Sequence, residues 1–291
     1  MNRRDVLKIS VLGAAALAVR PGPLLAATVT AKDAAAQLAA LESKHGGRLG
    51  VAILDTHNGH RIAHRGDERF LMCSTFKLLL VAAVLARVDG GVEKLGRRIV
   101  FDKGALLGWA PVTGMNVGAP GMTVQGLCEA AVMLSDNTAA NVLLEAMDGP
   151  ASVTAYVRSL GDKLTRLDHN EPLVNQEHGE QDTTTPWAML QTMQKVLLED
   201  ALSEPSRAML MSWLALNQTG AQSLRAGLPT DWRFGDKTGA SGDATNDVAI
   251  VWPPHREPLL VTAYYRADKR DSAQRKAVLA DVGSVVASLV A

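Results

Sequence analysis

The chain has 291 residues, 47% of them hydrophobic, and is therefore long enough to bury a sizeable core in one or two domains. Aromatic residues make up only 4% of it, and 30 basic residues balance 30 acidic ones. A nucleic-acid or sugar-binding surface usually needs excess positive charge or many stacking rings. Composition therefore argues against both kinds of partner.

Residues 1–27 have the pattern of an export signal peptide that is removed from the mature protein. A basic start containing Arg3, Arg4 and Lys8 precedes an apolar run over residues 9–19, and small residues follow. That run is too short to span a bilayer, and no later stretch is long and apolar enough, so we expect no membrane span. The paired arginines leave two export routes open, Sec and twin-arginine. We expect an exported, periplasmic protein.

The first predicted elements after this segment are one helix and a β-hairpin. Helical periodicity runs over residues 32–45, and Gly46 and Gly47 end it. A strand is predicted over 49–55. The pair Asn58-Gly59 is typical of a tight turn and leads to a partner strand over 61–64.

The middle of the chain is predicted to be helical, and its end returns to strands. A strongly apolar helix is expected over 74–88, followed by helices at 123–134, 138–147, 151–160, 186–198 and 204–216. The last elements expected are strands at 232–237, 248–252 and 259–265, turns at 239–246 and 253–258, and a helix over 272–290.

This order predicts an α/β (α+β) fold of two lobes. Residues 28–65 and 217–291 would form a lobe in which helices flank an antiparallel sheet, because both chain ends supply strands. Residues 66–216 would form an inserted all-α lobe. A cleft between two such lobes is the natural place for an active site.

The strongest chemical signal is Ser74-Thr75-Phe76-Lys77 at the start of the apolar helix. A serine hydroxyl is a weak nucleophile unless a nearby base takes its proton. Three residues apart on a helix, Ser74 and Lys77 share a face. The same four residues would also occur if the serine only capped the helix and the lysine lay on the surface. However, Lys77 is the one charge in an apolar segment. Burying a charged lysine is costly, so it indicates an oppositely charged partner or a functional role.

Two further motifs are ambiguous when taken singly. Ser135-Asp136-Asn137 lies between two predicted helices, where Ser135 could relay a proton and Asn137 could hold a carbonyl. The same three residues are also good helix caps. The motif Lys237-Thr238-Gly239 ends a predicted strand and could present a cation, a hydroxyl and backbone amides to an anion. The same motif would also occur where a strand ends in a charged residue before an ordinary turn.

Taken together and in this order, the three motifs resemble those of the penicillin-recognising active-site-serine enzymes, and the whole mature chain is similar to a class A serine β-lactamase. The resemblance implies that Ser74 is acylated and that Lys77 and Ser135 relay protons. It implies an oxyanion hole made by the amides of Ser74 and Ala240. The implied substrate-binding residues are Asn137, Asn175, Lys237, Thr238, Gly239, Ala240 and Trp109.

The segment Glu171-Pro172-Leu173-Val174-Asn175 resembles the Ω-loop of class A enzymes. A carboxylate there activates the water that hydrolyses the acyl-enzyme, and an amide four residues later helps to hold this water. The resemblance therefore implies that Glu171 is catalytic and that the Glu171–Pro172 bond is cis. It predicts a β-lactamase that hydrolyses penicillins and cephalosporins and confers resistance to them.

Several positions depart from the family pattern. His169 stands where many members have an arginine that pairs with a loop aspartate, here Asp182, so we expect a looser loop neck that admits bulky oxyimino-cephalosporins. Arg166 and Asp168 could form a second pair in the loop. An arginine that some members place after the third motif is missing. Arg225 or Arg275 could replace it, and the sequence does not choose between them.

The cysteines depart from the family pattern as well. The usual partner positions of Cys73 and Cys128 hold Ser241 and Val81, so two free thiols are predicted. We expect no cofactor or metal, a small-molecule β-lactam as the binding partner, and a monomer.

Two alternatives remain open beside this reading. One is a D,D-peptidase, that is, a penicillin-binding protein acting on peptidoglycan, and the other is a penicillin-sensing binding domain. Both would be acylated by a β-lactam and would stay acylated. Glu171 argues against both, because it supplies the base that releases the product.

Overall fold

The computed structural model describes residues 30–290. The predicted signal peptide, residues 1–27, lies outside the described residues. Within them, no helix combines the length and the apolar character that a membrane span requires.

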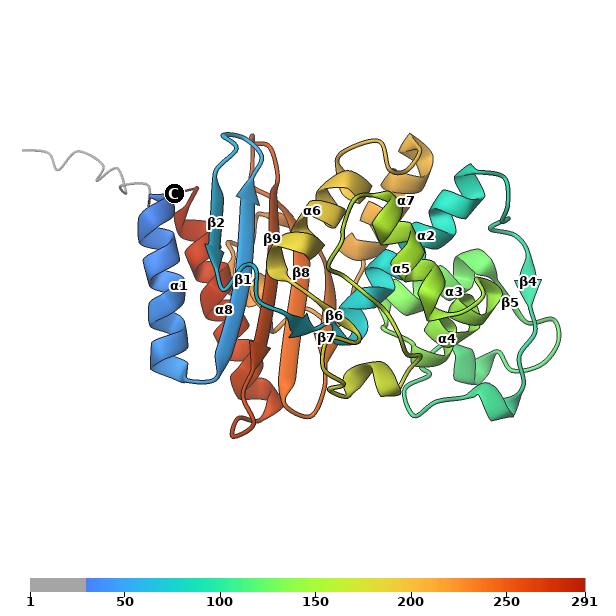
Figure 1. The fold of residues 1–291 in the computed structure, drawn as a ribbon. Coiled ribbons are helices and arrows are strands. Elements are labelled where there is room, and N and C mark those ends of the chain that lie inside the picture. The colour runs from blue at the N-terminus through green and yellow to red at the C-terminus, as the bar shows by residue number, and fades with distance from the viewer. Residues whose placement is uncertain (1–29, 291) are drawn as a thin grey trace, which may run out of the picture.

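A five-stranded antiparallel sheet forms one side of the molecule (Figure 1). Its strand order is β2-β1-β9-β8-β7, and every neighbouring pair is antiparallel. The strands are β1 (Arg48–Asp55), β2 (Arg61–His64), β7 (Arg233–Ala240), β8 (Ala244–Trp252) and β9 (Leu259–Arg266). The central strands are buried along nearly their whole length, because both faces of the sheet are covered.

Two helices from opposite ends of the sequence cover one face of the sheet. They are α1 (Ala31–His45) and α8 (Ser272–Ser288), and they lie against each other at the left of Figure 1. Side-chain caps start both helices. Thr30 accepts a hydrogen bond from the amide of Asp33, and Asp271 forms a capping box with Gln274.

The other side of the molecule is helical. Its helices are α2 (Phe76–Asp89), α3 (Val124–Met133), α4 (Asn137–Ala146), α5 (Pro150–Ser159), α6 (Pro186–Leu197) and α7 (Glu204–Ala215). The first ten residues of α2 are all buried, so this helix runs through the centre of the helical side. One hydrophobic cluster joins α2 to its neighbours and to the inner face of the sheet, and a second lies between the outer face and α1 and α8.

Short segments complete the chain and border the region described below. Strand β3 (Phe70–Leu71) pairs with β6 (Thr183–Thr184), and β4 (Arg98–Ile99) pairs with β5 (Met122–Thr123). The 3₁₀ segments are η1 (Cys73–Thr75), η2 (Lys103–Ala105), η3 (Thr113–Met115), η4 (Leu173–Asn175) and η5 (Leu224–Gly227).

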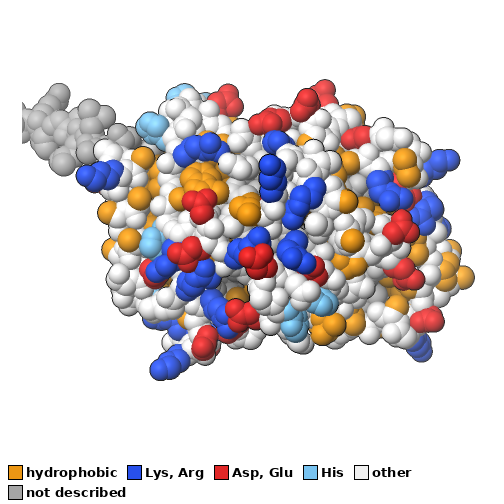
Figure 2. Space-filling model, viewed as in Figure 1, with side chains coloured by type: hydrophobic (Ala, Val, Ile, Leu, Met, Phe, Trp, Pro, Cys, Tyr) orange, Lys and Arg blue, Asp and Glu red, His pale blue; other side chains and the backbone are white. Residues whose placement is uncertain are grey.

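Charges of both signs are interspersed over the face shown in Figure 2. Several charged side chains of opposite sign pair with each other, as in the contacts of Arg48 with Glu68 at 2.8 Å and of Arg69 with Glu180 at 3.3 Å. This distribution agrees with the equal numbers of basic and acidic residues in the sequence.

The predicted fold class is confirmed, with an antiparallel sheet, flanking helices from both ends of the chain and a helical middle. The predicted turn over 239–246 is wrong. Strand β7 continues to Ala240 and β8 starts at Ala244, which leaves only residues 241–243 for the turn. The lobe boundaries, 28–65 and 217–291 for one lobe and 66–216 for the other, stay a prediction.

Candidate active site

Three buried side chains meet at the start of α2. Lys77 Nζ donates a hydrogen bond to Ser74 Oγ at 3.0 Å, and the Ser74 hydroxyl donates to Glu171 Oε1 at 3.1 Å. Lys77 and Glu171 also form an ion pair, with 3.0 Å between Nζ and Oε1. Ser74 lies in η1, one turn before Lys77, so helical spacing directs both side chains to the same place. The hydroxyl therefore donates to a carboxylate that can take its proton and accepts from a lysine that can supply one.

Lys77 holds this cluster against the helical side. Its Nζ also donates to the backbone carbonyl of Ser135 at 2.9 Å and to Asn137 Oδ1 at 2.5 Å. Burial lowers the pKa of Lys77, and the Glu171 carboxylate opposes that effect. A lysine in this environment gives up its proton more easily than one in water, and proton transfer with Ser74 requires this property.

Ser135 connects Lys77 to Lys237. Ser135 has a φ of 56° in the connection between α3 and α4, and Lys237 Nζ donates to its Oγ at 3.0 Å. Burial, with repulsion from the Lys77 ammonium, lowers the pKa of Lys237 to about 7. The next residue, Asp136, caps α4 by accepting from the amide of Ala139 at 2.9 Å, so the second motif holds both a helix cap and a residue of the cluster.

The third motif lies on β7, an edge strand of the sheet. At Gly239 the strand passes very close to η1: a Cβ atom there would lie 2.8 Å from the carbonyl oxygen of Met72 and 3.1 Å from the amide nitrogen of Ser74. Glycine is therefore required for this approach. The approach brings the backbone of β7 beside Ser74, where the resemblance places the oxyanion hole.

A cleft of about 290 Å³ opens over this cluster. Ser74, Ser135 and Asn137 line it together with Thr238, Gly239, Ala240 and Asn175. Trp109 lines it as well. This indole is 54% exposed and donates from Nε1 to the carbonyl of Leu134 at 2.9 Å. The structure thus brings the predicted site residues together, with Lys77, Glu171 and Lys237 buried beneath the lining.

Glu171 is fixed by groups on both sides of it. The Glu171–Pro172 bond is cis, as expected. Asn141 accepts from the amide of Glu171 and donates to its carbonyl, both at 2.9 Å. Asn175 Nδ2 donates to Glu171 Oε2 at 2.6 Å, while Asn175 Oδ1 is buried and has no hydrogen-bond partner among the described residues.

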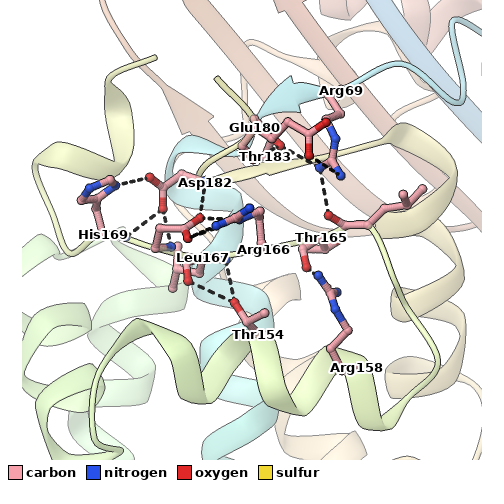
Figure 3. A network of polar contacts seen from close by, with 12 residues as sticks. Arg69, Thr154, Arg158, Thr165, Arg166, Leu167, His169, Glu180, Asp182 and Thr183 are labelled. Atoms are coloured by element: carbon pink, nitrogen blue, oxygen red, sulfur yellow. Dashed lines mark hydrogen bonds and ion pairs between the residues drawn. The ribbon is translucent and has the colours of Figure 1, made fainter. Parts of the chain in front are cut away.

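The neck of this loop is closed by hydrogen bonds to Asp182 (Figure 3). The backbone amides of Asp168 and His169 donate to Asp182 Oδ1 at 2.8 and 2.9 Å, and His169 Nδ1 lies 2.6 Å from Oδ2. Arg166 pairs with Asp168 at 2.6 Å, as the sequence suggested. The neck is therefore not open. The expectation of a looser neck now rests on one difference only. The His169 ring makes a single contact with Asp182, where the guanidinium of an arginine would make two.

Sequence reasoning missed several residues of the cleft wall. Thr219, Ser223 and Lys276 line the cleft, whereas Arg275 is buried and donates to Thr245 Oγ1 at 3.1 Å. Arg225 lies over the ring of Phe234, 5.6 Å from its centroid. The cation that α8 turns to the cleft is thus Lys276, one position after Arg275. Helical periodicity in α8 could have separated these two neighbours, since consecutive residues face different directions.

Both cysteines are free, as predicted, and both are buried. Cys73 directly precedes Ser74, and burial raises the pKa of its thiol to about 12. Its neighbourhood in the structure includes Ser241, the position where the family pattern would have placed a disulfide partner.

The sequence is similar to known β-lactamases over nearly its whole length. A model of the beta-lactamase enzyme family matches residues 33–290. Beta-lactamase OXY-2 of Klebsiella oxytoca is 44% identical over 285 residues, which cover 96% of each chain. Beta-lactamase L2 of Stenotrophomonas maltophilia is also 44% identical, over 100% of this chain and 99% of its own.

Solved structures show the same similarity. A reconstructed ancestral class A β-lactamase is 57% identical, with a TM-score of 0.85 over 87% of this chain and 98% of its own. A β-lactamase from Xanthomonas campestris is 45% identical, with a TM-score of 0.87 over 90% of this chain and all of its own.

Proposed function

The chain belongs to the beta-lactamase enzyme family and is a class A serine β-lactamase, and from this premise we propose the role of each residue in its hydrolysis of β-lactams. The observation that carries the proposal is the buried cluster of Ser74, Lys77 and Glu171, whose three side chains lie within 3.1 Å of one another. We expect penicillins and cephalosporins as substrates.

In the first step, Ser74 Oγ attacks the carbonyl carbon of the β-lactam ring. Its proton passes to the Glu171 carboxylate, which already accepts a hydrogen bond from the hydroxyl. The ring C–N bond then breaks, and the leaving nitrogen takes a proton from Lys77 through Ser135, whose hydroxyl lies 3.5 Å from Lys77 Nζ and 3.0 Å from Lys237 Nζ. Glu171 returns its proton to Lys77 across the 3.0 Å contact between them. An acyl-enzyme on Ser74 results.

Strand β7 binds and polarises the substrate in this scheme. The amides of Ser74 and Ala240 stabilise the oxyanion that forms on the carbonyl, and the close approach at Gly239 supports this assignment. Lys237 and Thr238 bind the substrate carboxylate, Asn137 holds the side-chain amide, and Trp109 packs against the bound molecule. The exposed indole of Trp109 at the cleft rim supports its role.

In the second step, Glu171 activates a water molecule that hydrolyses the ester. The unpaired, buried Oδ1 of Asn175 supports this step, because such an oxygen lacks a donor that a water beside Glu171 would supply. The water loses a proton to the Glu171 carboxylate and attacks the ester carbon. The bond to Ser74 Oγ then breaks, and this oxygen takes the proton back from Glu171, which it contacts.

Repeated turnover of nitrocefin by the purified protein tests the scheme, and Glu171→Ala should accumulate an acyl-enzyme visible by intact-protein mass spectrometry. Glu177→Ala changes an exposed carboxylate of the same loop and should leave turnover unchanged. If Glu171→Ala deacylates at the wild-type rate, Glu171 is not the base. A single stoichiometric burst from the wild type would instead support the D,D-peptidase or the penicillin-sensing domain.

We also propose export to the periplasm through residues 1–27 and a monomeric state. Both rest on the sequence. N-terminal sequencing of protein from the periplasmic fraction tests the first, and sedimentation equilibrium tests the second.

A further inference from the structure

Two aspartates lie buried against each other behind the third motif. Asp236 is on β7 and Asp247 is on β8, with exposed fractions of 3% and 0%. Because Asp247 pairs in register with Thr238, and successive strand residues alternate, Asp236, Thr238 and Asp247 point to one face of the sheet and Lys237 points to the other. The carboxyl groups of Asp236 and Asp247 are in hydrogen-bonding contact.

The donors around this pair satisfy only part of it. Asn217 Nδ2 donates to Asp236 Oδ2 at 2.7 Å, and the amide of Leu224 donates to Asp247 Oδ2 at 3.2 Å. Asp247 Oδ1 is buried and has no donor within residues 30–290. Two carboxylate anions in contact would repel each other and would both lack hydration, whereas a proton on this oxygen removes the repulsion and supplies the missing hydrogen bond.

The surrounding charges do not replace that proton. The cations that act on the pair are Lys237 on β7 and Arg225 of η5. Lys237 donates to Ser135 and to the carbonyl of Thr238. Arg225 lies over Phe234. These cations are thus engaged elsewhere. With one shared proton, the two carboxyl groups together carry a single negative charge.

The pair also fixes a segment of the cleft wall, residues 217–224. At Gly220 this segment presses on Asp236, since a Cβ there would lie 2.1 Å from Oδ2. The neighbouring Thr219 Oγ1 lies 2.5 Å from Thr238 Oγ1. A shift of Asp236 would thus move Thr219 and Thr238, which both line the cleft.

We propose that Asp236 and Asp247 share one proton, carried on Asp247 Oδ1, and that the protonated pair positions residues 217–224 and Thr238 for the anionic group of the substrate. The two aspartates are positioning residues that act through this segment. Burial raises the pKa of both carboxyl groups, in agreement with a proton retained at neutral pH. The positioning role rests on the proposed function, whereas the shared proton does not.

The shared proton is tested by infrared spectroscopy of the wild-type protein at neutral pH. We expect the C=O stretch of a protonated carboxyl, shifted by isotope-labelled aspartate and lost in Asp247→Asn. Asp231→Asn removes an exposed aspartate that precedes β7 and should keep the band. A wild-type protein without this band overturns the proposal, even where a variant fails to fold.

The positioning role is tested by the kinetics of a β-lactam that carries a carboxylate. Asp236→Ala should raise KM about tenfold and leave kcat nearly unchanged, because it removes one buried hydrogen bond to the segment. Asp236→Asn should restore KM, since its amide can accept from Asn217 and donate to Asp247. If Asp236→Asn is no better than Asp236→Ala, or if kcat falls instead of KM rising, the positioning role is wrong. Failure of the proposed function would appear separately, as a wild-type protein without nitrocefin turnover.

Discussion

Gly239 shows how one missing methyl group sets the geometry of the site. A Cβ there would lie 2.8 Å from the Met72 carbonyl oxygen, which is closer than real Cβ contacts allow. We expect Gly239→Ala to push β7 away from Ser74 and to lower kcat/KM about a hundredfold, since small displacements of a site cost this much. Gly242→Ala is the matched control, because open space surrounds Gly242 in the adjacent turn. Equal activity of the two variants would contradict the geometric role of Gly239.

The lowered pKa of Lys237 predicts how the free energy of unfolding depends on pH. Its pKa is about 7 in the folded protein and about 10.4 in an unfolded chain. Between these values the unfolded state binds the extra proton, so the contribution of Lys237 to the free energy of unfolding rises by up to about 1.4 kcal/mol per pH unit.

The side chain at position 237 no longer titrates in Lys237→Met. The free energy of unfolding of this variant, minus that of the wild type, should therefore fall as the pH rises from about 7 to about 9. Urea unfolding at several pH values measures the difference. Lys44→Met, at a side chain that is 67% exposed, should show a constant difference. A constant difference for Lys237→Met as well would mean that the lysine is not desolvated as the structure indicates.

At the scale of residues, spacing predicted the centre of the site and missed its wall. Ser74 and Lys77 are one helical turn apart, so a local rule brings them together. Asp247 carries no such signal, because its partner in the buried pair comes from the neighbouring strand. Only tertiary packing makes Asp247 a buried partner of Asp236.

Among the elements, α4 depends on an unusually well-connected cap. The carboxylate of Asp136 accepts from the amides of Ala139, Val112 and Thr113 and from the Thr113 hydroxyl. Asp136→Ala should lower the free energy of unfolding by about 3 kcal/mol, because buried donors lose their acceptor. Asp271→Ala removes the exposed cap of α8 and should cost only about 1 kcal/mol. Equal losses in chemical denaturation would argue against this role of Asp136.

The Ω-loop neck allows a test of substrate preference. His169→Arg should add one hydrogen bond to Asp182, worth about 1 kcal/mol, and should tighten the loop. We expect the ratio of the cefotaxime rate to the penicillin rate to fall roughly fivefold. His178 cannot serve as control, because its ring lies 5.2 Å from that of His169. Gln176→Arg instead adds a positive charge at an exposed position of the loop and serves as control. An unchanged ratio in His169→Arg would remove the link between the neck and bulky substrates.

The elements themselves were largely predictable, and the exception has a physical cause. Periodicity and caps located the helices, with ends such as that of α6 within one residue of the expected range. The turn expected over 239–246 failed because Gly239 reads as a turn residue, although it lies within β7 for close packing against η1. Composition does not separate these two uses of glycine.

At the scale of the whole molecule, the two thiols report on global unfolding. Cys73 and Cys128 are fully buried, and burial raises the pKa of both thiols. Neither should react promptly with a thiol reagent in the folded protein at about pH 8. Two should react after denaturation without a reducing agent. Fewer than two reactive groups in the denatured protein would indicate a covalent modification or a disulfide.

The packing of α1 against α8 has a consequence for how the chain could be rearranged. A short linker from α8 back to α1 would join two neighbours, and new ends could be opened at the exposed Asn58-Gly59 turn. Such a circular permutant would make the sheet lobe from one nearly continuous stretch of sequence, yet every contact among Ser74, Lys77 and Glu171 would remain. The site therefore depends on how the sheet side and the helical side pack together, and not on the order in which their segments follow each other in the sequence.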